Sequence, residues 1–167
     1  MRATGSMLGS TGGSAALLVA SLALVSVVAA VGGVAASRSV GDWYEGLDRA
    51  PWNPPSWVFG PAWTVLYVLM AVAAWLVARE GLDDSAVRTA LALYGVQLAL
   101  NLGWSVVFFG LRRPGLALIE IVVLFVAVAA TAIAFQAVSA PAAWLLVPYL
   151  AWVAFAASLN AWVSFAN

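Results

Sequence analysis

Long apolar runs separated by short polar segments dominate the hydrophobic pattern of this chain. From Ala3 to Ser37 there is no charged residue, and the core of that run, about 15–36, is long enough to cross a bilayer. Four further apolar runs follow, at about 56–78, 89–111, 114–138 and 142–165. Because a spanning helix needs about 20 apolar residues, the pattern predicts five transmembrane helices in a single domain, residues 14–167.

The breaks between these runs carry recognisable helix boundaries. Asp83 or Asp84 in the charged turn at 79–88 can cap the third helix, and Pro114 suits the first turn of the fourth. No charged residue follows Glu120, so the stretch VSAP at 138–141 is the natural break between the fourth and fifth helices. An odd number of spans places the two termini on opposite sides of the membrane.

The segments around the first run admit alternatives. Residues 1–13, rich in glycine and small polar residues, predict a flexible start. A cleavable signal peptide is the rival interpretation of the first run, although that run exceeds the roughly 7–15 residues of an ordinary signal-peptide core. The polar connector at 37–55 predicts a long loop. If this loop dips into the bilayer, the fold is six-helical or re-entrant and the loop backbone must be buried in protein.

Composition supports an all-α integral membrane protein. The chain is 65% hydrophobic and 8% charged, with a mean hydropathy of +1.01, whereas a soluble domain carries about 25% charged residues. Net charge is zero and no basic tract is present, which argues against a nucleic-acid partner. Three arginines fall on the N-terminal side and four on the other, so the positive-inside rule leaves the orientation open.

Three residue types that carry much enzyme and metal chemistry are missing. Cysteine and histidine are absent, and all seven basic residues are arginine. Disulfides, thiolate or imidazole metal ligands, Cys/His or Ser/His nucleophile pairs and lysine Schiff bases are therefore excluded on this chain. We expect no metal site and no resident cofactor.

Three predicted helix faces carry aromatic or amide side chains where leucine or valine would serve against lipid. Residues three, four or seven apart share a face, which groups these positions as follows: Phe59, Trp63, Tyr67 and Met70; Gln97, Asn101, Trp104 and Phe108; Trp152, Ala156 and Leu159. An amide without a hydrogen-bond partner in hydrocarbon costs roughly several kcal/mol. Amides in spanning helices therefore face a partner helix or a cavity. The faces predict a shared internal pocket.

Simpler explanations exist for some of these residues. Tryptophans near helix ends serve as interfacial anchors, an interpretation that fits Trp43, Trp52, Trp57, Trp144 and Trp162. Amides can also join helices by hydrogen bonds of about 0.6–2 kcal/mol.

Two further features of the predicted spans have alternative roles. Glu120, the only acid within a predicted span, is either a proton site or a side chain that snorkels and pairs with Arg112 or Arg113; we favour the pairing. The small residues Ala29, Gly32, Gly33 and Ala36 predict close helix packing within the protomer or in a dimer.

The stretch APWNPPSWVFGPAW, residues 50–63, precedes the second span. Pro54 and Pro55 stiffen an extended segment and remove two backbone donors, while Pro61 lies early in the helix. A rigid segment that carries Trp52 and Trp57 predicts a lid over the end of the bundle where the three faces open.

The chain resembles the TspO/MBR family of tryptophan-rich sensory proteins, which are related to the mitochondrial translocator protein or peripheral benzodiazepine receptor. The resemblance rests on WYEGLDRAPWNPPSWVFGPAWTVLY (43–67), ALYGVQLALNLGWSVVFFG (92–110) and VPYLAWVAFAASLN (147–160). It implies a five-helix membrane protein, commonly homodimeric. It also implies binding of porphyrins such as protoporphyrin IX, of sterols in some members, and of benzodiazepine-type drugs, in a pocket under the first loop.

Carried over position by position, the resemblance implies one set of ligand-binding residues: Tyr44, Pro54, Phe59, Trp63, Tyr67, Asn101, Trp104, Trp152, Ala156 and Leu159. Two tryptophans matching Trp63 and Trp152 are linked, in some bacterial members, to light- and oxygen-dependent porphyrin breakdown. A sterol-recognition pattern of the animal members has a tyrosine and an arginine where this chain has Ala161 and Phe165, so strong sterol binding is not expected.

The resemblance and the aromatic faces together favour a multi-pass prokaryotic membrane protein that binds porphyrin and acts as a sensor or regulator of stress responses. The membrane is the cell membrane, or the outer membrane if the source is Gram-negative. Whether the protein is an enzyme is left open: photo-oxidative porphyrin degradation, with Trp63 and Trp152 as the catalytic residues, is one alternative, and transport of porphyrin or another amphiphile is the other. Indole rings suit a flat macrocycle, and the lack of His and Cys favours metal-free porphyrin over haem.

Overall fold

The structure is a computed structural model that describes residues 11–41 and 43–167. Within those residues the regular elements are helical, and the five long helices are α1 (Thr11–Val40), α2 (Phe59–Ala78), α3 (Ser85–Ser105), α4 (Pro114–Val138) and α5 (Ala140–Ala166). Each lies in a segment long and apolar enough to cross a membrane. The predicted all-α membrane protein with five spanning helices is therefore confirmed.

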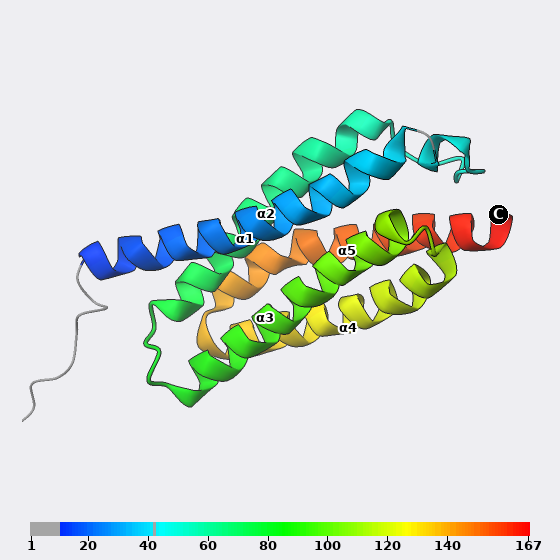
Figure 1. Ribbon diagram of the computed structural model, residues 1–167. Helices are drawn as coiled ribbons and strands as arrows, with labels where there is room; N and C mark the ends of the chain where they lie inside the picture. Colours follow the sequence, from blue (N-terminus) through cyan, green and yellow to red (C-terminus); the bar gives the residue numbers. More distant parts are fainter. Residues whose placement is uncertain (1–10, 42) are drawn as a thin grey trace, which may run out of the picture.

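The five helices form an elongated bundle whose connectors gather at its two ends (Figure 1). α1 packs along α2, α3 packs along α4, and α5 contacts both α4 and α2. The segment joining α1 to α2, the turn joining α3 to α4, and the last turn of α5 lie at one end, which we call the loop end. The turns between α2 and α3 and between α4 and α5 lie at the opposite end.

The observed helix ends refine the predicted ones. α1 is longer than the predicted 15–36, so residues 11–13, predicted as flexible, and residues 37–40, predicted as loop, are helical. Residues 1–10, also predicted as flexible, lie outside the described residues. α3 begins at Ser85 rather than 89 because the Asp84 side chain caps it, accepting a hydrogen bond from the Ala86 amide at 2.7 Å. Asp84 is one of the two caps that the sequence predicted, whereas the predicted apolar run began only after the charged Arg88.

The last two helices follow the expected signals closely. α4 begins at Pro114 and ends at Val138, as predicted. Ser139 is extended, with φ −151° and ψ 104°, and α5 starts at Ala140, slightly before the predicted 142, with a proline in its first turn.

The connector between α1 and α2 lies a few residues later in the chain than the predicted 37–55 loop and contains regular structure. It contains two single-turn 3₁₀ helices, η1 (Tyr44–Gly46) and η2 (Ser56–Val58), and α2 proper starts at Phe59 rather than 56. Among the described residues no sixth helix of membrane length is present, so the fold has five spans and the six-helix alternative is wrong.

The end of α3 departs from α-helical geometry. Residues Val106–Gly110 form a π-helix, η3, in which the Leu111 amide donates to the Val106 carbonyl at 2.8 Å. Because a π-helix has more residues per turn than an α-helix, the rotation about the helix axis between consecutive side chains is smaller. Phe108 and Phe109 consequently contact each other, with ring centroids 4.8 Å apart. The Ser39 hydroxyl donates to the Phe109 carbonyl at 2.6 Å and ties α1 to this turn.

Part of the small-residue stripe on α1 is used inside the protomer. A Cβ atom at Gly32 would lie 3.3 Å from the Ser105 hydroxyl oxygen, so this glycine allows α1 to approach α3 closely. A Cβ atom at Gly33 would meet nothing within 4 Å. Homodimer formation stays a prediction.

Candidate functional site

A cavity of about 150 Å³ lies between the helices at the loop end, and we call it the central cavity. Its wall comes from all three predicted faces and from the α1–α2 connector. The lining residues are Ala36, Tyr44, Ser56, Phe59, Trp63, Trp104, Phe108, Phe109, Trp152, Ala156, Leu159, Asn160 and Val163. Most of this wall is aromatic or aliphatic, as expected for a site that takes an apolar ligand.

Seven of the ten predicted ligand-binding residues line the central cavity: Tyr44, Phe59, Trp63, Trp104, Trp152, Ala156 and Leu159. The other three lie nearby in different roles. Tyr67 and Asn101 form a polar network within the bundle, and Pro54 lies in the connector, where its carbonyl accepts a hydrogen bond from the Asn53 amide at 3.0 Å. The resemblance thus named most of the wall, and helical spacing had grouped six of these seven residues, all but Tyr44. Neither separated wall residues from supporting ones.

The aromatic side chains of the wall contact one another across helices. The Trp63 and Trp152 ring centroids are 6.4 Å apart in an edge-on arrangement, and Phe59 lies 5.9 Å from Trp152. On the α3 side, Trp104 stacks on Phe108 at 5.4 Å. These rings from α2, α3 and α5 provide both flat faces and edges toward the cavity.

A polar network lies where α2, α3 and α5 meet. The Tyr67 hydroxyl donates to Asn101 Oδ1 at 2.8 Å, and the Asn101 amide donates to the Tyr149 hydroxyl at 3.2 Å. Asn101 and Tyr149 are at most 1% exposed. Because Tyr67 neighbours Trp63 at 5.5 Å between ring centroids, this network holds the α2 side of the cavity against α3 and α5.

Asn160 is a second buried junction, which the three predicted faces did not include. Its Oδ1 accepts from Trp104 Nε1 at 3.0 Å, and its amide donates to the Pro114 carbonyl at 2.8 Å and to the Ser164 hydroxyl at 3.1 Å. Asn160 therefore joins α3, α4 and α5 and orients one cavity indole. A buried amide one residue after Leu159 was the available signal.

Phe109, Ala36, Ser56 and Val163 were also missed. Phe109 reaches the cavity because η3 is a π-helix, and regular α-helical spacing places only Phe108 on that face. Val163 continues the α5 face one turn beyond Leu159, so its spacing was a usable signal.

Among the described residues of the wall, one indole N–H is both buried and unpaired. Trp152 Nε1 is buried and has no hydrogen-bond partner, whereas Trp104 Nε1 is bound to Asn160. Buried polar groups in native proteins almost always have partners, so an unpaired N–H beside a cavity is a candidate for an acceptor group of a ligand.

A second hollow of about 410 Å³ adjoins the central cavity, and we call it the side hollow. It runs between α1 and α2 from Leu22 to Ala36 on α1 and also involves Thr64, Tyr67 and Ser105. Five residues line both spaces: Ala36, Phe59, Trp63, Trp104 and Phe109. The two spaces are therefore neighbours separated only by shared side chains.

The α1–α2 connector forms the roof of the central cavity through Tyr44 and Ser56. The Tyr44 hydroxyl donates to Asn53 Oδ1 at 2.9 Å. Burial raises the pKa of Tyr44, while the Arg49 charge and the Asn53 hydrogen bond act in the opposite direction. The predicted lid segment is thus held by Tyr44 and Asn53.

The tryptophans assigned as anchors divide into two groups. Trp57 and Trp144 are 75% and 70% exposed, as expected for interfacial anchors, and Trp52 is 51% exposed. Trp43 instead packs on Phe108 at 5.6 Å, and Trp162 packs on Trp52 at 5.3 Å with its own N–H buried. Trp43 and Trp162 therefore pack within the loop end. Their positions near predicted helix ends did not predict this packing.

The favoured pairing of Glu120 with Arg112 or Arg113 is wrong. Both arginines are exposed, and no ion pair forms between them and Glu120 in the described part of the chain. The carboxyl group lies against α3, where a Cβ atom at Gly103 would be 2.5 Å from Glu120 Oε1, and its Oε2 is buried without a partner. The absence of a side chain at Gly103 makes room for this arrangement. A proton-transfer role for Glu120 stays a prediction.

Comparison with known proteins agrees with this architecture. The model of the TspO/MBR family matches residues 20–166. The chain is 45% identical over 118 residues to "Tryptophan-rich protein TspO" of Chlorobaculum tepidum, covering 71% of this chain and 75% of that protein. It is 48% identical over 120 residues to "Translocator protein" of Homo sapiens, covering 71% and 70%. "Tryptophan-rich sensory protein" of Cereibacter sphaeroides is 47% identical over 120 residues, covering 71% and 73%.

The family match covers most of the chain, including every described residue that lines the central cavity. The match and the five spanning helices together show a multi-pass integral membrane protein. This chain belongs to the TspO/MBR family.

Proposed function

We propose that this protein is a membrane-embedded sensor that binds a porphyrin through the central cavity. The observation that carries the proposal is the wall itself, in which indole and phenyl rings from three helices surround a space beside an unpartnered indole N–H. A flat aromatic macrocycle offers faces for these rings and carboxylate oxygens for the N–H group. The sensory and translocator names of relatives are consistent with a binding role.

Size decides how such a ligand would lie. A cavity of about 150 Å³ is smaller than the roughly 300–1,000 Å³ of most ligand pockets. The side hollow of about 410 Å³ adjoins it, and the two together reach that range. We therefore infer that a porphyrin displaces the shared side chains and occupies both spaces, with Phe59, Trp63 and Trp104 against its faces.

A dark titration of the purified protein in detergent micelles with protoporphyrin IX tests this proposal. Saturable quenching of tryptophan fluorescence at micromolar ligand is expected for the wild type. The affinity, which porphyrin fluorescence reports for each variant, should fall in the double variant Trp63→Phe/Trp152→Phe. The control is Trp144→Phe, because this side chain is 70% exposed and lines neither space. Absence of saturable binding to the wild type would overturn the proposal.

One observation favours a second candidate function, light-dependent porphyrin breakdown. Trp63 and Trp152 lie on the same cavity wall with ring centroids 6.4 Å apart, so an indole oxidised next to the ligand has an aromatic neighbour. Illumination of the complex in the presence of dioxygen checks this candidate. Bleaching of the porphyrin Soret band that is lost in Trp63→Phe/Trp152→Phe supports it, and bleaching at the wild-type rate in that variant excludes a role for the two residues.

A glycine variant tests whether the side hollow is part of the site. Gly33 lines this hollow and has nothing within 4 Å of an added Cβ, so Gly33→Leu fills space without clashing at its Cβ. We expect protoporphyrin IX affinity to fall about tenfold, equivalent to about 1.4 kcal/mol. Gly95→Leu is the matched control, because Gly95 also has open space around it and lines neither space. Unchanged affinity in Gly33→Leu would confine the ligand to the central cavity.

A further inference from the structure

We propose that Arg49 is the anion-binding residue of this site and that it selects ligands with a carboxylate over neutral ligands of the same shape. The inference rests on the proposed function, since it assumes that a porphyrin-like molecule occupies the central cavity. It adds a specificity-determining residue that lies outside the cavity wall.

Arg49 lies on the roof of the cavity. Its guanidinium carbon is 5.7 Å from the ring centroid of Tyr44, which lines the central cavity and is 7% exposed. Tyr44 is itself held by its hydrogen bond to Asn53. The cation is therefore positioned against a fixed aromatic ring that itself lines the cavity.

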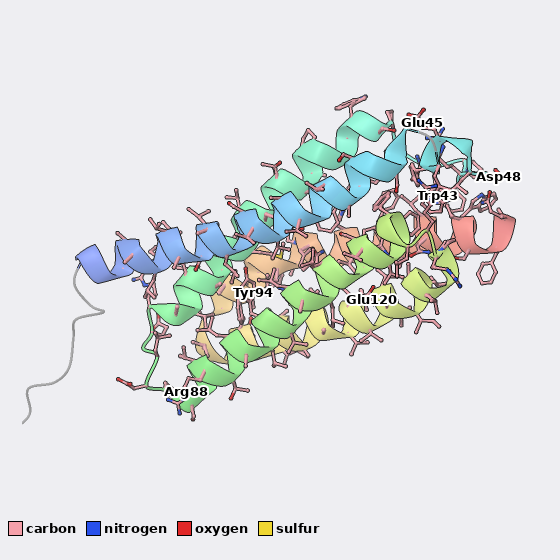
Figure 2. All side chains as sticks on the ribbon, in the orientation of Figure 1. Trp43, Glu45, Asp48, Arg88, Tyr94 and Glu120 are labelled. Carbon is pink, nitrogen blue, oxygen red and sulfur yellow. The ribbon has the colours of Figure 1, made fainter. Side chains whose placement is uncertain are left out.

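The guanidinium of Arg49 has no acidic partner in the described part of the chain. No hydrogen bond or ion pair engages its side chain there, and the contact with Tyr44 is the interaction that it makes. The neighbouring acids Glu45 and Asp48 are exposed, and Figure 2 shows both at the loop end. A half-buried guanidinium without a carboxylate has its donors available for a ligand.

The other basic side chains that the structure describes are placed less favourably. Arg79 and Arg88 flank the α2–α3 turn at the opposite end, where Figure 2 labels Arg88. Arg112 and Arg113 are exposed, and Arg112 lines a different hollow beside Val31 and Val34. The described residues that line the central cavity include no charged side chain. Among these described side chains, Arg49 is the cation that contacts a residue of the cavity wall.

The chemistry of guanidinium suits this position. Its planar donor fork matches the two oxygens of a carboxylate, and partial burial strengthens such a pair relative to one in water. A ligand with an apolar macrocycle and flexible acidic chains could place the ring system among the indoles and direct one carboxylate toward Arg49. The ligand class is therefore a flat amphiphile with a carboxylate at one edge.

Protoporphyrin IX and its dimethyl ester form a matched ligand pair for the test, because the ester keeps the macrocycle and removes both negative charges. Dark titrations compare wild type, Arg49→Gln and Arg49→Lys, and porphyrin fluorescence reports binding. Arg112→Gln is the control for loss of a positive charge at the same end of the bundle. Binding of the ester also reports whether each variant is folded around the cavity.

The proposal expects Arg49→Gln to weaken binding of the diacid at least tenfold and to leave ester binding unchanged, with Arg49→Lys recovering part of the loss. Equal effects on diacid and ester, or no effect on either, would overturn the role of Arg49 while leaving the porphyrin site in place. If neither ligand saturates the wild type, the proposed function fails and this inference fails with it.

Discussion

Replacing Asn101 with leucine lowers the free energy of unfolding by about 2 kcal/mol. Asn101 is the centre of the Tyr67–Asn101–Tyr149 network, and its loss leaves two tyrosine hydroxyls without these partners inside the bundle. Interhelical hydrogen bonds in membranes contribute about 0.6–1.7 kcal/mol each, so two broken bonds account for this value. Circular dichroism of the protein unfolded in mixed detergent micelles measures the change.

Gln97→Leu is the matched control for Asn101→Leu. Gln97 lies one turn away on the same face of α3 and is also 1% exposed. Its Oε1 has no partner, and its amide makes only a 4.0 Å contact with the Met70 sulfur. Because little bonding is lost and an unpaired polar atom is removed, we expect unchanged or slightly higher stability. Equal destabilisation by both variants would show that the hydrogen bonds of the network add nothing to the free energy of unfolding beyond the effect of changing the side-chain shape.

Replacing Trp63 with alanine weakens protoporphyrin IX binding at least about thirtyfold, equivalent to about 2 kcal/mol, which is the range of a dominant contact residue. Trp63 lines both the central cavity and the side hollow, and its ring contacts Tyr67, Tyr149 and Trp152. Its removal takes away a stacking face at the junction of the two spaces. Porphyrin fluorescence measures the affinity, because tryptophan quenching changes with the substitution itself.

Two further variants distinguish the loss of a ligand contact at Trp63 from an effect of the substitution on folding. Trp144→Ala removes an indole of the same size that is 70% exposed and lines neither space, so its affinity should equal that of the wild type. Trp63→Phe keeps an aromatic face, so its affinity for protoporphyrin IX should lie between those of the wild type and Trp63→Ala. Wild-type affinity in a folded Trp63→Ala protein would contradict the proposed placement of the macrocycle.

Much of the cavity wall could be predicted from the sequence because its residues repeat at helical spacing. Phe59 and Trp63 on α2, and Trp152, Ala156 and Leu159 on α5, line the cavity as the faces predicted. The same spacing also grouped Tyr67 and Asn101 with the wall, although they form the supporting network. Spacing specifies the side of a helix and leaves open whether its neighbour there is a cavity or another side chain.

Other side-chain contacts depend on which helices pack together, and the local pattern of the sequence does not predict that packing. Glu120 lies against Gly103 of α3 instead of pairing with an arginine a few residues away. Trp43 and Trp162, near predicted helix ends, pack on other aromatic rings. In each case the partner is distant in sequence, and its position is set by how the helices pack.

By itself, the sequence determined the class of the protein, the number of spans, the absence of cysteine and histidine chemistry, and the faces that carry aromatic and amide groups. These properties follow from composition and from the 3.6-residue period, which every segment expresses locally. Only the tertiary structure decided that η3 turns Phe109 toward the cavity, that Asn160 joins three helices, and that Arg49 lies over Tyr44. The Asn160 junction comes from contacts between segments far apart in the chain. The π-helix and the contact of Arg49 with Tyr44 are local, but a regular 3.6-residue period does not describe either of them.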